Sequence, residues 1–326
     1  MTPAIAGEGA ATPDLRCGIE AMATRFELVL SSDREGDETR LRAIGEEALA
    51  EIARLETRLS VFQAASDISW INAHAGQRPV KVEPAVFGLI QRCLALSAAT
   101  DGAFDITVGP LLRLWKVRED PQPGPQDPRP LPAPDAVADA RSRVGYQHVR
   151  LDPRASTIQF AHEGMALDLG AAGKGWAIDQ AIAILRAHGR TSALLHGGTS
   201  SIHAIGQPLD GDAWRVAWNP PGDHGRIFEL CGGALSVSAV HGQSFWNQGR
   251  EYGHVVDPIT GWPTYAAASA VVTGPASFEC DALSTALLVL GADWLPTLRE
   301  RFPEYDGEVA PPAAYGRGAG PVRERR

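Results

Sequence analysis

The chain has 326 residues, enough for one large domain or two average ones. With 44% hydrophobic and 21% charged residues it has the composition of an ordinary soluble globular protein, and no apolar segment of about 18 residues predicts a membrane span. The formal net charge of −9 argues against a nucleic-acid partner, because binding phosphates requires a basic face.

The amino-terminal part of the chain predicts one strand and two helices. Residues 1–17 show no periodicity and are expected to be a disordered segment. Apolar and polar residues alternate over residues 24–32, as in a half-buried strand. Over residues 41–59, apolar residues recur at three- and four-residue steps, which predicts an amphipathic helix of about six turns. A second helix is predicted over residues 84–99, with Pro84 at its start.

The rest of the chain predicts hairpins, short strands and two more helices. Residues 119–135 are rich in proline and are expected to be an extended surface insert, neither a helix nor an inner strand. Residues 166–189 indicate a strand end, a glycine loop and a helix closed by Gly189. The other predicted elements are a hairpin over 148–161, short strands over 192–196, 214–218, 227–230, 253–257 and 267–273, and a last helix over 279–290 that ends at Gly291.

The order of these elements favours an α+β fold over a doubly wound parallel sheet, because strands and helices alternate irregularly and hairpin signals lie between them. We expect one domain over residues 18–306. Residues 307–326 are rich in Gly, Pro, Ala and Arg and are expected to be a disordered tail.

Glycines and a lysine mark the loop before the helix that Gly189 closes. Gly170, Gly173 and Gly175 let a backbone approach a ligand closely, and the free N–H groups at a helix start can bind an anion. Lys174 adds a positive charge, so the segment suits a phosphate or pyrophosphate. The spacing matches neither a Walker loop nor a GxGxxG fingerprint. A glycine-rich turn with a solvated lysine explains the loop equally well.

Asp281 and Thr285 stand four residues apart on the last predicted helix, so both side chains project from one face. A carboxylate and a hydroxyl together suit a hard cation such as magnesium. From these two residues alone the structural interpretation is the better one: an aspartate favoured by the helix dipole, and a threonine bonded back to the preceding turn.

Two further positions carry side chains that suit catalysis or ligand binding. His254 precedes a tight turn at Asp257–Pro258, where a histidine can act as a base or contact a ligand, although a lone histidine is more often structural. Phe104 and Asp105 could hold a ring system by stacking and hydrogen bonding. They could equally be a core residue and a helix cap.

The order of these signals along the chain resembles the FAD:protein FMN transferase family (ApbE-type flavin transferases). The resemblance runs from about Glu20 to Leu290 and is carried by the blocks MATRFELVL, LETRLSVFQAASDISWINAH, DGAFDITVGPLLRLW, LDLGAAGKGWAIDQA, GHVVDPITGWP and CDALSTALLVLG. It implies a single ApbE-like, T-fold-related α+β domain with mixed or antiparallel sheets and packed helices. It also implies that FAD binds in a cleft with Mg²⁺ beside the pyrophosphate.

The same resemblance assigns site residues by position. Those that match FAD contacts are Met22, Phe62, Ala103, Phe104, Asp105, Asp168, Lys174, His254 and Val255, the last through its backbone. Those that match metal ligands are Asp281, Thr285 and the backbone carbonyl of Ala171, with Ser284 completing the shell directly or through water. Two stretches depart from the family pattern: Thr199 stands where relatives usually have aspartate, and Ala239–Val240 replaces the usual Ser-Gly step.

The implied reaction is Mg²⁺-dependent transfer of FMN from FAD to a threonine or serine hydroxyl of an acceptor flavoprotein, with release of AMP. Asp281 and His254 are the catalytic candidates, and His254 would assist removal of the hydroxyl proton. The alternatives are an FAD pyrophosphatase that releases FMN and AMP from the same site, and a non-catalytic FAD-binding protein. No signal peptide or lipobox is visible, which predicts a cytoplasmic protein, or a periplasmic one if the sequence lacks its signal.

Overall fold

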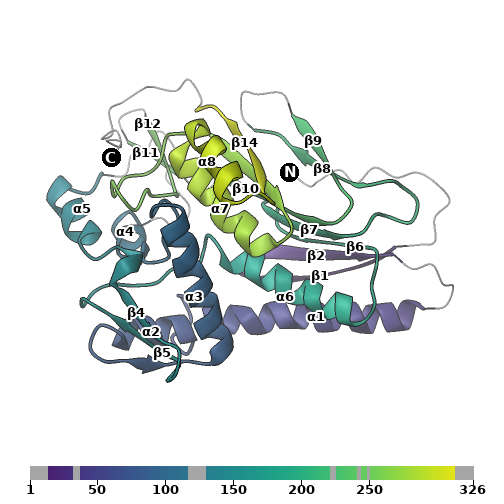
Figure 1. The fold of residues 1–326 in the computed structure, drawn as a ribbon, viewed down its shortest axis with the longest axis horizontal. Helices are drawn as coiled ribbons and strands as arrows, with labels where there is room; N and C mark the ends of the chain where they lie inside the picture. Colours follow the sequence, from purple (N-terminus) through teal and green to yellow (C-terminus); the bar gives the residue numbers. More distant parts are fainter. Residues whose placement is uncertain are drawn as a thin grey trace.

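A central antiparallel sheet organises the molecule. The computed structural model describes residues 14–31, 37–116, 130–220, 225–240, 244–247 and 250–312. Within these residues, seven strands follow the order β1-β2-β6-β7-β10-β13-β14, and neighbouring strands are antiparallel (Figure 1). The strands are β1 (Leu15–Ala21), β2 (Thr24–Leu30), β6 (Ala193–Gly197), β7 (Ser201–Ile205), β10 (Gly233–Ala239), β13 (Ser269–Gly274) and β14 (Asp306–Ala310). This order places segments from both ends of the chain in one sheet.

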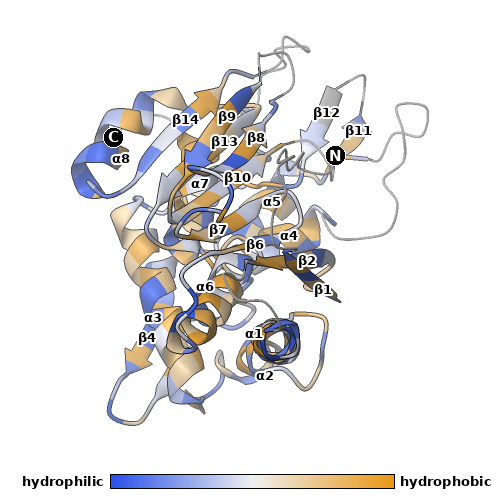
Figure 2. Cartoon of the chain, turned by 90° about the vertical axis from the view of Figure 1, so that its right-hand side faces the viewer, coloured by the Kyte–Doolittle hydropathy of each residue, from blue (hydrophilic) through white to orange (hydrophobic). Residues whose placement is uncertain are grey.

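Helices cover one face of this sheet and a hairpin covers the other (Figures 1 and 2). The helices are α1 (Glu38–Leu59), α6 (Gly173–Ala187) and α7 (Ser277–Leu290), with α8 (Leu295–Arg301) beside β14, and the hairpin is β8 (Trp214–Trp218) and β9 (Arg226–Leu230). Side chains alternate along a strand. Leu28 and Leu30 of β2 therefore join the core on the helix side, whereas Val29 packs with Trp214 and Trp218 of the hairpin.

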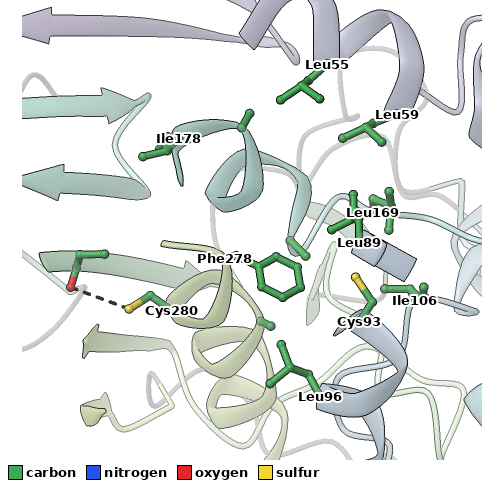
Figure 3. Packing of buried hydrophobic residues seen from close by; sticks show 14 of the residues in the cluster. Leu55, Leu59, Leu89, Cys93, Leu96, Ile106, Leu169, Ile178, Phe278 and Cys280 are labelled. Atoms are coloured by element: carbon green, nitrogen blue, oxygen red, sulfur yellow. Dashed lines mark hydrogen bonds between the residues drawn. The ribbon is translucent and has the colours of Figure 1, made fainter. Parts of the chain in front are cut away.

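The core on the helix side is the larger one, and the apolar residues that recur at helical spacing in the sequence form part of it. The α1 residues that recur at three- and four-residue steps are all buried, and these are Leu41, Ile44, Ala48, Ile52, Leu55 and Leu59. Phe278 of α7 is fully buried and lies between side chains of α3 (Pro84–Ala99) and α6, as Figure 3 shows. This core holds α6 and α7 side by side.

A second group of elements lies beyond α7, at the left of Figure 1. It comprises α2 (Asp67–His74), α3, α4 (Gly109–Leu114), α5 (Pro134–Arg141), the strands β3 (Val80–Lys81), β4 (Val149–Asp152) and β5 (Thr157–Phe160), and the hairpin β11 (Ser244–Asn247) and β12 (Arg250–Gly253). Short 3-10 turns cover Tyr146–His148 and Ala292–Trp294. Trp115, after α4, stacks on Tyr252 with ring centroids 6.2 Å apart and so ties α4 to β12.

Most of the predicted elements are confirmed, as is the α+β class. The strand over 24–32 is β2, the helices over 41–59 and 84–99 are α1 and α3, and the hairpin over 148–161 is β4 and β5. Helix α6 ends at Ala187, and Gly189 follows it with φ of 72°, the left-handed conformation that glycine favours after a helix.

Some predicted boundaries are wrong. Residues 15–17 belong to β1 and residues 307–310 belong to β14, so both of the segments expected to be disordered were drawn too far into the domain. Strand β14 pairs with β13, from which α7 and α8 separate it in the sequence, and such non-local pairing leaves little local signal, whereas β1 forms a hairpin with the neighbouring strand β2. The remainder of the two predicted ends, 1–13 and 313–326, lies outside the described residues.

Two other elements also differ from expectation. The proline-rich insert was predicted to reach residue 135, but α5 starts at Pro134, because proline is well tolerated in a first helical turn. Residues 117–129 of the insert lie outside the described part of the chain. The strand predicted over 253–257 is wrong: β12 ends at Gly253, and only Val256 makes an isolated bridge, to Pro263. Helix α8 follows α7, so the helix over 279–290 is not the last.

None of the helices in the described residues combines the length and the hydropathy that crossing a bilayer requires.

Candidate functional site

The start of α6 packs directly against the start of α7, and Gly175 is the point of contact. A Cβ atom at Gly175 would lie 2.2 Å from the carbonyl oxygen of Ser277, so only glycine fits there. The backbone N–H of Gly175 donates to Oδ2 of Asp281 at 2.6 Å. Gly175 lies in the first turn of α6, where backbone N–H groups have no partner within the helix, so Asp281 satisfies this donor. The glycine loop is thus joined directly to Asp281.

The Asp281 carboxylate is buried, with 5% of the residue exposed, and is held by hydrogen-bond donors from the sheet and the loop. Its Oδ1 accepts hydrogen bonds from the hydroxyls of Ser201 in β7, at 2.7 Å, and Ser236 in β10. Its Oδ2 accepts the Gly175 N–H. An ionised carboxylate can only accept hydrogen bonds, so these donors suit its charge and fix its orientation.

The other oxygens on this face of α7 belong to Ser284 and Thr285. Both hydroxyls donate to the carbonyl oxygen of Asp281, at 3.0 and 3.1 Å. The structure therefore contains the back-bonded threonine that the structural interpretation of the sequence anticipated. Ser238 Oγ lies 2.9 Å from Ser284 Oγ and 3.1 Å from Thr285 Oγ1, so a strand hydroxyl faces both helix hydroxyls.

The side-chain and backbone oxygens at this junction are the kind of ligand that a hard cation such as Mg²⁺ prefers. In the parts of the chain that the structure describes, no group of three or more His, Cys, Asp or Glu side chains could hold a metal. A cation here would instead use Asp281, the Thr285 hydroxyl and backbone oxygen. Among the described residues, no backbone N–H donates to the Ala171 carbonyl, which leaves it able to bind a cation. Half-buried Lys174, next to Gly175, adds a positive charge suited to phosphate.

The segment before the glycine loop is fixed by side chains from α2 and from its own turn. The Asn72 side chain forms two hydrogen bonds with the backbone of Leu167: Oδ1 accepts the N–H at 2.7 Å, and Nδ2 donates to the carbonyl oxygen at 2.9 Å. Asp168 is buried, its Oδ1 accepts the Gly170 N–H at 2.8 Å, and its own N–H donates to the Ile106 carbonyl at 2.7 Å. These bonds give the loop a defined entry to α6.

The block Ala103–Asp105 lies inside the molecule. Ala103 and Phe104 are 1% and 2% exposed and belong to the main core, so the Phe104 ring occupies the core position that was one of its two interpretations. Asp105 accepts hydrogen bonds from the N–H and hydroxyl of Thr107 and from the N–H of Tyr146, at 2.7–2.8 Å. Burial raises the pKa of the Asp105 carboxyl, and these hydrogen bonds oppose that rise only in part.

Met22 and Phe62 both lie near the carboxyl end of α1. Met22 and Ala23 have φ of 50° and 58° in the tight turn between β1 and β2, a conformation that residues other than glycine rarely adopt. The N–H of Met22 donates to the Glu56 carboxylate of α1 at 2.7 Å, which holds this turn in place. Phe62 follows α1, and 71% of it is exposed, so its ring is accessible to a planar ligand.

His254 and Val255 directly follow β12. A Cβ atom at Gly253 would lie 2.7 Å from the carbonyl oxygen of Val240, so the residue before His254 packs closely against the end of β10. His254 is half-buried, and the Val255 carbonyl accepts the N–H of Thr264 at 2.9 Å. Val240, which belongs to a step expected to depart from the family pattern, therefore lies against the residue before His254.

The predicted turn after His254 is present and is anchored from α4. Asp257 Oδ1 accepts the Ile259 N–H at 2.9 Å, and the Asp257 carbonyl accepts the Gly261 N–H at 2.8 Å. The indole Nε1 of fully buried Trp115 donates to the Gly261 carbonyl at 2.8 Å. This network fixes the chain that leads away from His254.

Asp179 anchors the start of α7 from α6. Its carboxylate accepts the N–H groups of Ser277 and Phe278 at 2.8 and 2.9 Å, satisfying donors that a helix start leaves free. Its Oδ1 also lies 3.4 Å from Nδ1 of buried His203. Burial acts to raise the pKa of Asp179, but the hydrogen bonds from His203, Phe278 and Ser277 outweigh it and lower that pKa.

Comparison with known proteins identifies the fold and the family. A family model described as the ApbE family matches residues 22–306. The chain belongs to the ApbE family. The FAD:protein FMN transferase of Treponema pallidum is 31% identical over 280 residues, covering 80% of this chain and 75% of that protein. A Klebsiella pneumoniae protein of the same name is 31% identical over 267 residues, covering 79% and 74%. The named relatives of this ApbE-family chain are thus transferases.

Solved structures agree with this assignment to the ApbE family. The crystal structure of the ApbE protein of Thermotoga maritima superposes with a TM-score of 0.79 at 27% identity, covering 91% of this chain and 94% of that one. The apo form of the flavinyl transferase ApbE of Pseudomonas stutzeri gives 0.76 at 28% identity, covering 91% and 95%. The single α+β domain is therefore the ApbE fold.

The sequence interpretation missed several side chains that shape this ApbE-family site. They are Glu56, Asn72, Asp179, Ser201, Ser236 and Ser238. Their bonds join residues far apart in the chain, as in the pairing of Ser201 with Asp281, 80 positions later. A weak signal existed in the alternation of Ser236, Val237 and Ser238, which places both serines on one face of a strand.

Proposed function

We propose that this protein transfers FMN from FAD to a threonine or serine hydroxyl of an acceptor protein, in a Mg²⁺-dependent reaction that releases AMP. Membership of the ApbE family and the names of the curated relatives support FMN transfer. The single observation that carries the proposal for this chain is the hydrogen bond from Gly175 N–H to Asp281 Oδ2. It places a carboxylate beside a glycine-rich helix start, where phosphates and a cation can be bound together.

FAD would lie across the residues assigned to it by position. The exposed ring of Phe62 can stack on a planar ring system, and Lys174 in the first turn of α6 suits the pyrophosphate. Because the Phe104 side chain is buried in the core, this segment would contact FAD through its backbone. Met22, Asp168 and Val255 complete the proposed contacts.

The proposed metal ligands are Asp281, Thr285 and the Ala171 carbonyl, with Ser284 acting directly or through water. All are oxygen ligands, the kind that Mg²⁺ prefers, and phosphate oxygens and water would complete its coordination. A bound Mg²⁺ would neutralise the charge that develops on the pyrophosphate during transfer.

In the proposed reaction, the acceptor hydroxyl oxygen forms a bond to the FMN-side phosphorus of FAD. The bond between this phosphorus and the bridging oxygen breaks, and that oxygen leaves with AMP. His254 accepts the hydroxyl proton, a role that typically contributes ~10²–10⁴-fold to a rate. Lys174 holds the phosphates in line with the attacking oxygen.

The test is incubation of the protein with FAD, Mg²⁺ and candidate acceptors, such as proteins encoded nearby, followed by a denaturing gel. We expect flavin fluorescence on the acceptor band, lost with a metal chelator and in Asp281→Ala, and strongly reduced in His254→Ala. FMN and AMP formed at the same rate without acceptor would indicate a pyrophosphatase instead. Protein that stays yellow but shows neither transfer nor FAD turnover with any acceptor would contradict the proposal and indicate a binding protein.

A further inference from the structure

Serine hydroxyls on two strands of the sheet face the oxygen-bearing side of α7. Ser236 and Ser238 stand two residues apart on β10 and therefore lie on the same face of that strand. Ser201 of β7 lies opposite Ser236 in the register of the two strands. Ser201 and Ser236 are each 1% exposed, so their hydroxyls are buried against α7 and away from bulk water.

Ser201 and Ser236 both act on a single oxygen of Asp281. Their hydroxyls donate to Oδ1, while Oδ2 faces Gly175. Ser236 Oγ also lies 2.9 Å from the carbonyl oxygen of Ser200, but its one proton can serve only one acceptor, and an ionised carboxylate is the stronger. Two hydroxyl protons occupy the lone pairs of Oδ1, which leaves a lone pair on Oδ2, toward the glycine loop, for a cation.

Ser238 acts in the same way on the neighbouring hydroxyls. The protons of Ser284 and Thr285 point to the Asp281 carbonyl, so the proton of Ser238 is the one available between them. The Ser238 hydroxyl lies within hydrogen-bond distance of both, and its contact with Thr285 Oγ1 restrains the orientation of that hydroxyl. The strand serines thus contact both proposed side-chain ligands, Asp281 and Thr285.

We propose that Ser201, Ser236 and Ser238 are positioning residues that orient Asp281 and Thr285 for Mg²⁺, an inference that rests on the metal site proposed above. Partners of this kind fix the orientation of metal ligands, and their loss typically costs ~10–100-fold in metal affinity.

The experiment measures metal binding directly, with no reference to turnover. Mn²⁺ is titrated into the protein in the presence of ADP, which offers a pyrophosphate but no FMN to transfer, and free Mn²⁺ is followed by electron paramagnetic resonance. We expect the Mn²⁺ dissociation constant of the double variant Ser201→Ala/Ser236→Ala to rise ~10–100-fold. A smaller rise is expected for each single variant.

Ser192→Ala is the matched control. Ser192 is also buried, at 6% exposure, and its hydroxyl donates to the Gln207 carbonyl at 2.7 Å, so its loss removes a comparable hydrogen bond at a position that does not contact Asp281. We expect this variant to lose some thermal stability and to keep the wild-type dissociation constant. A purely structural role for the strand serines would give the double variant the same result, which would overturn the inference.

Two further outcomes are decisive. If the double variant does not fold, Ser238→Ala at a half-buried position provides the test: a clear rise in the Mn²⁺ dissociation constant supports the inference, and wild-type or tighter binding overturns it. If the wild-type protein with ADP binds no Mn²⁺, the proposed metal site is wrong, and the positioning role of the serines is then wrong as well. Wild-type binding that survives in every serine variant refutes only the positioning role.

Discussion

Replacing Gly175 with alanine tests the contact that brings the glycine loop to Asp281. The added Cβ would meet backbone atoms of α7, the Ser277 carbonyl oxygen at 2.2 Å and its carbon at 2.6 Å, and the Cα of Phe278 at 2.9 Å. These atoms belong to a helix start held by Asp179, so they cannot turn aside as a flexible side chain could. The helices must therefore move apart, by about 1 Å if the carbon is to reach ordinary contact distance.

The expected cost has two parts. Forcing an extra methyl group into a packed core costs ~1–3 kcal/mol. Separating the helices also weakens the hydrogen bond from Gly175 N–H to the Asp281 carboxylate, and a bond to a charged group is worth ~1.5–3 kcal/mol. A loss near 3 kcal/mol would lower the melting temperature of a chain of this size by roughly 4 °C.

The assay compares urea unfolding and FAD turnover in wild type, Gly175→Ala and a matched control, Gly88→Ala. Gly88 lies within α3, and a Cβ atom there would meet nothing within 4 Å. Alanine at this position should raise stability by ~0.5–1 kcal/mol, because it has the higher helix propensity. We expect Gly175→Ala to lose both stability and Mg²⁺-dependent turnover. A Gly175→Ala protein as stable and as active as wild type would refute the reasoning.

Other predictions concern residues around the junction. Asp179→Asn should destabilise the protein by roughly 1–3 kcal/mol at neutral pH, because the carboxylate holds the first N–H groups of α7. The pKa of Asp179 is lowered by folding, so this difference should be full above about pH 4 and should disappear as the pH falls through the folded-state pKa, as chemical unfolding across pH would show. Phe62→Ala should weaken FAD binding roughly 2- to 13-fold, because one stacking contact is lost, and should leave the melting temperature unchanged, because the ring is exposed. A fluorescence titration that gives the wild-type affinity would show that Phe62 does not contact FAD. Trp115→Phe should leave the Gly261 carbonyl without its indole donor and lower the free energy of unfolding by ~1–3 kcal/mol. It should lower the transfer rate more than the FAD affinity. A variant with wild-type stability would show that this bond does not anchor the turn.

The elements that could be predicted from the sequence are those whose pattern is local. The periodic apolar residues of α1 and α3 each identify one buried face, which the structure confirms. The alternation in β2 locates a strand, but Val29 on its other face is buried as well, against the β8–β9 hairpin. Strand β14 escaped prediction because Asp306–Ala310 carries acidic residues and lies in a tail-like context, while its place in the sheet depends on pairing with β13. Pairing over such distances is decided by the whole fold.

The site shows the same division between local and distant information. The Asp281 and Thr285 side chains could be placed on one helix face from their spacing, and Lys174 beside the glycine loop from its neighbours. Nothing local in the sequence joins Gly175 to Asp281, 106 positions apart, or the serines of β7 and β10 to the same carboxylate. The sequence around Phe104 allowed two interpretations, a ligand contact or a core residue, and the packing around its ring shows that it is a core residue.

The central claim is that a cation binds between the glycine loop and α7. It is tested most directly by a crystal structure of the protein with FAD and Mn²⁺, in which the metal is located by its anomalous scattering. We expect the peak within about 2.2 Å of Asp281 Oδ2, Thr285 Oγ1 and the Ala171 carbonyl oxygen, and beside the pyrophosphate. A peak elsewhere in the molecule, or these oxygens too far apart to share one ion, would contradict the account.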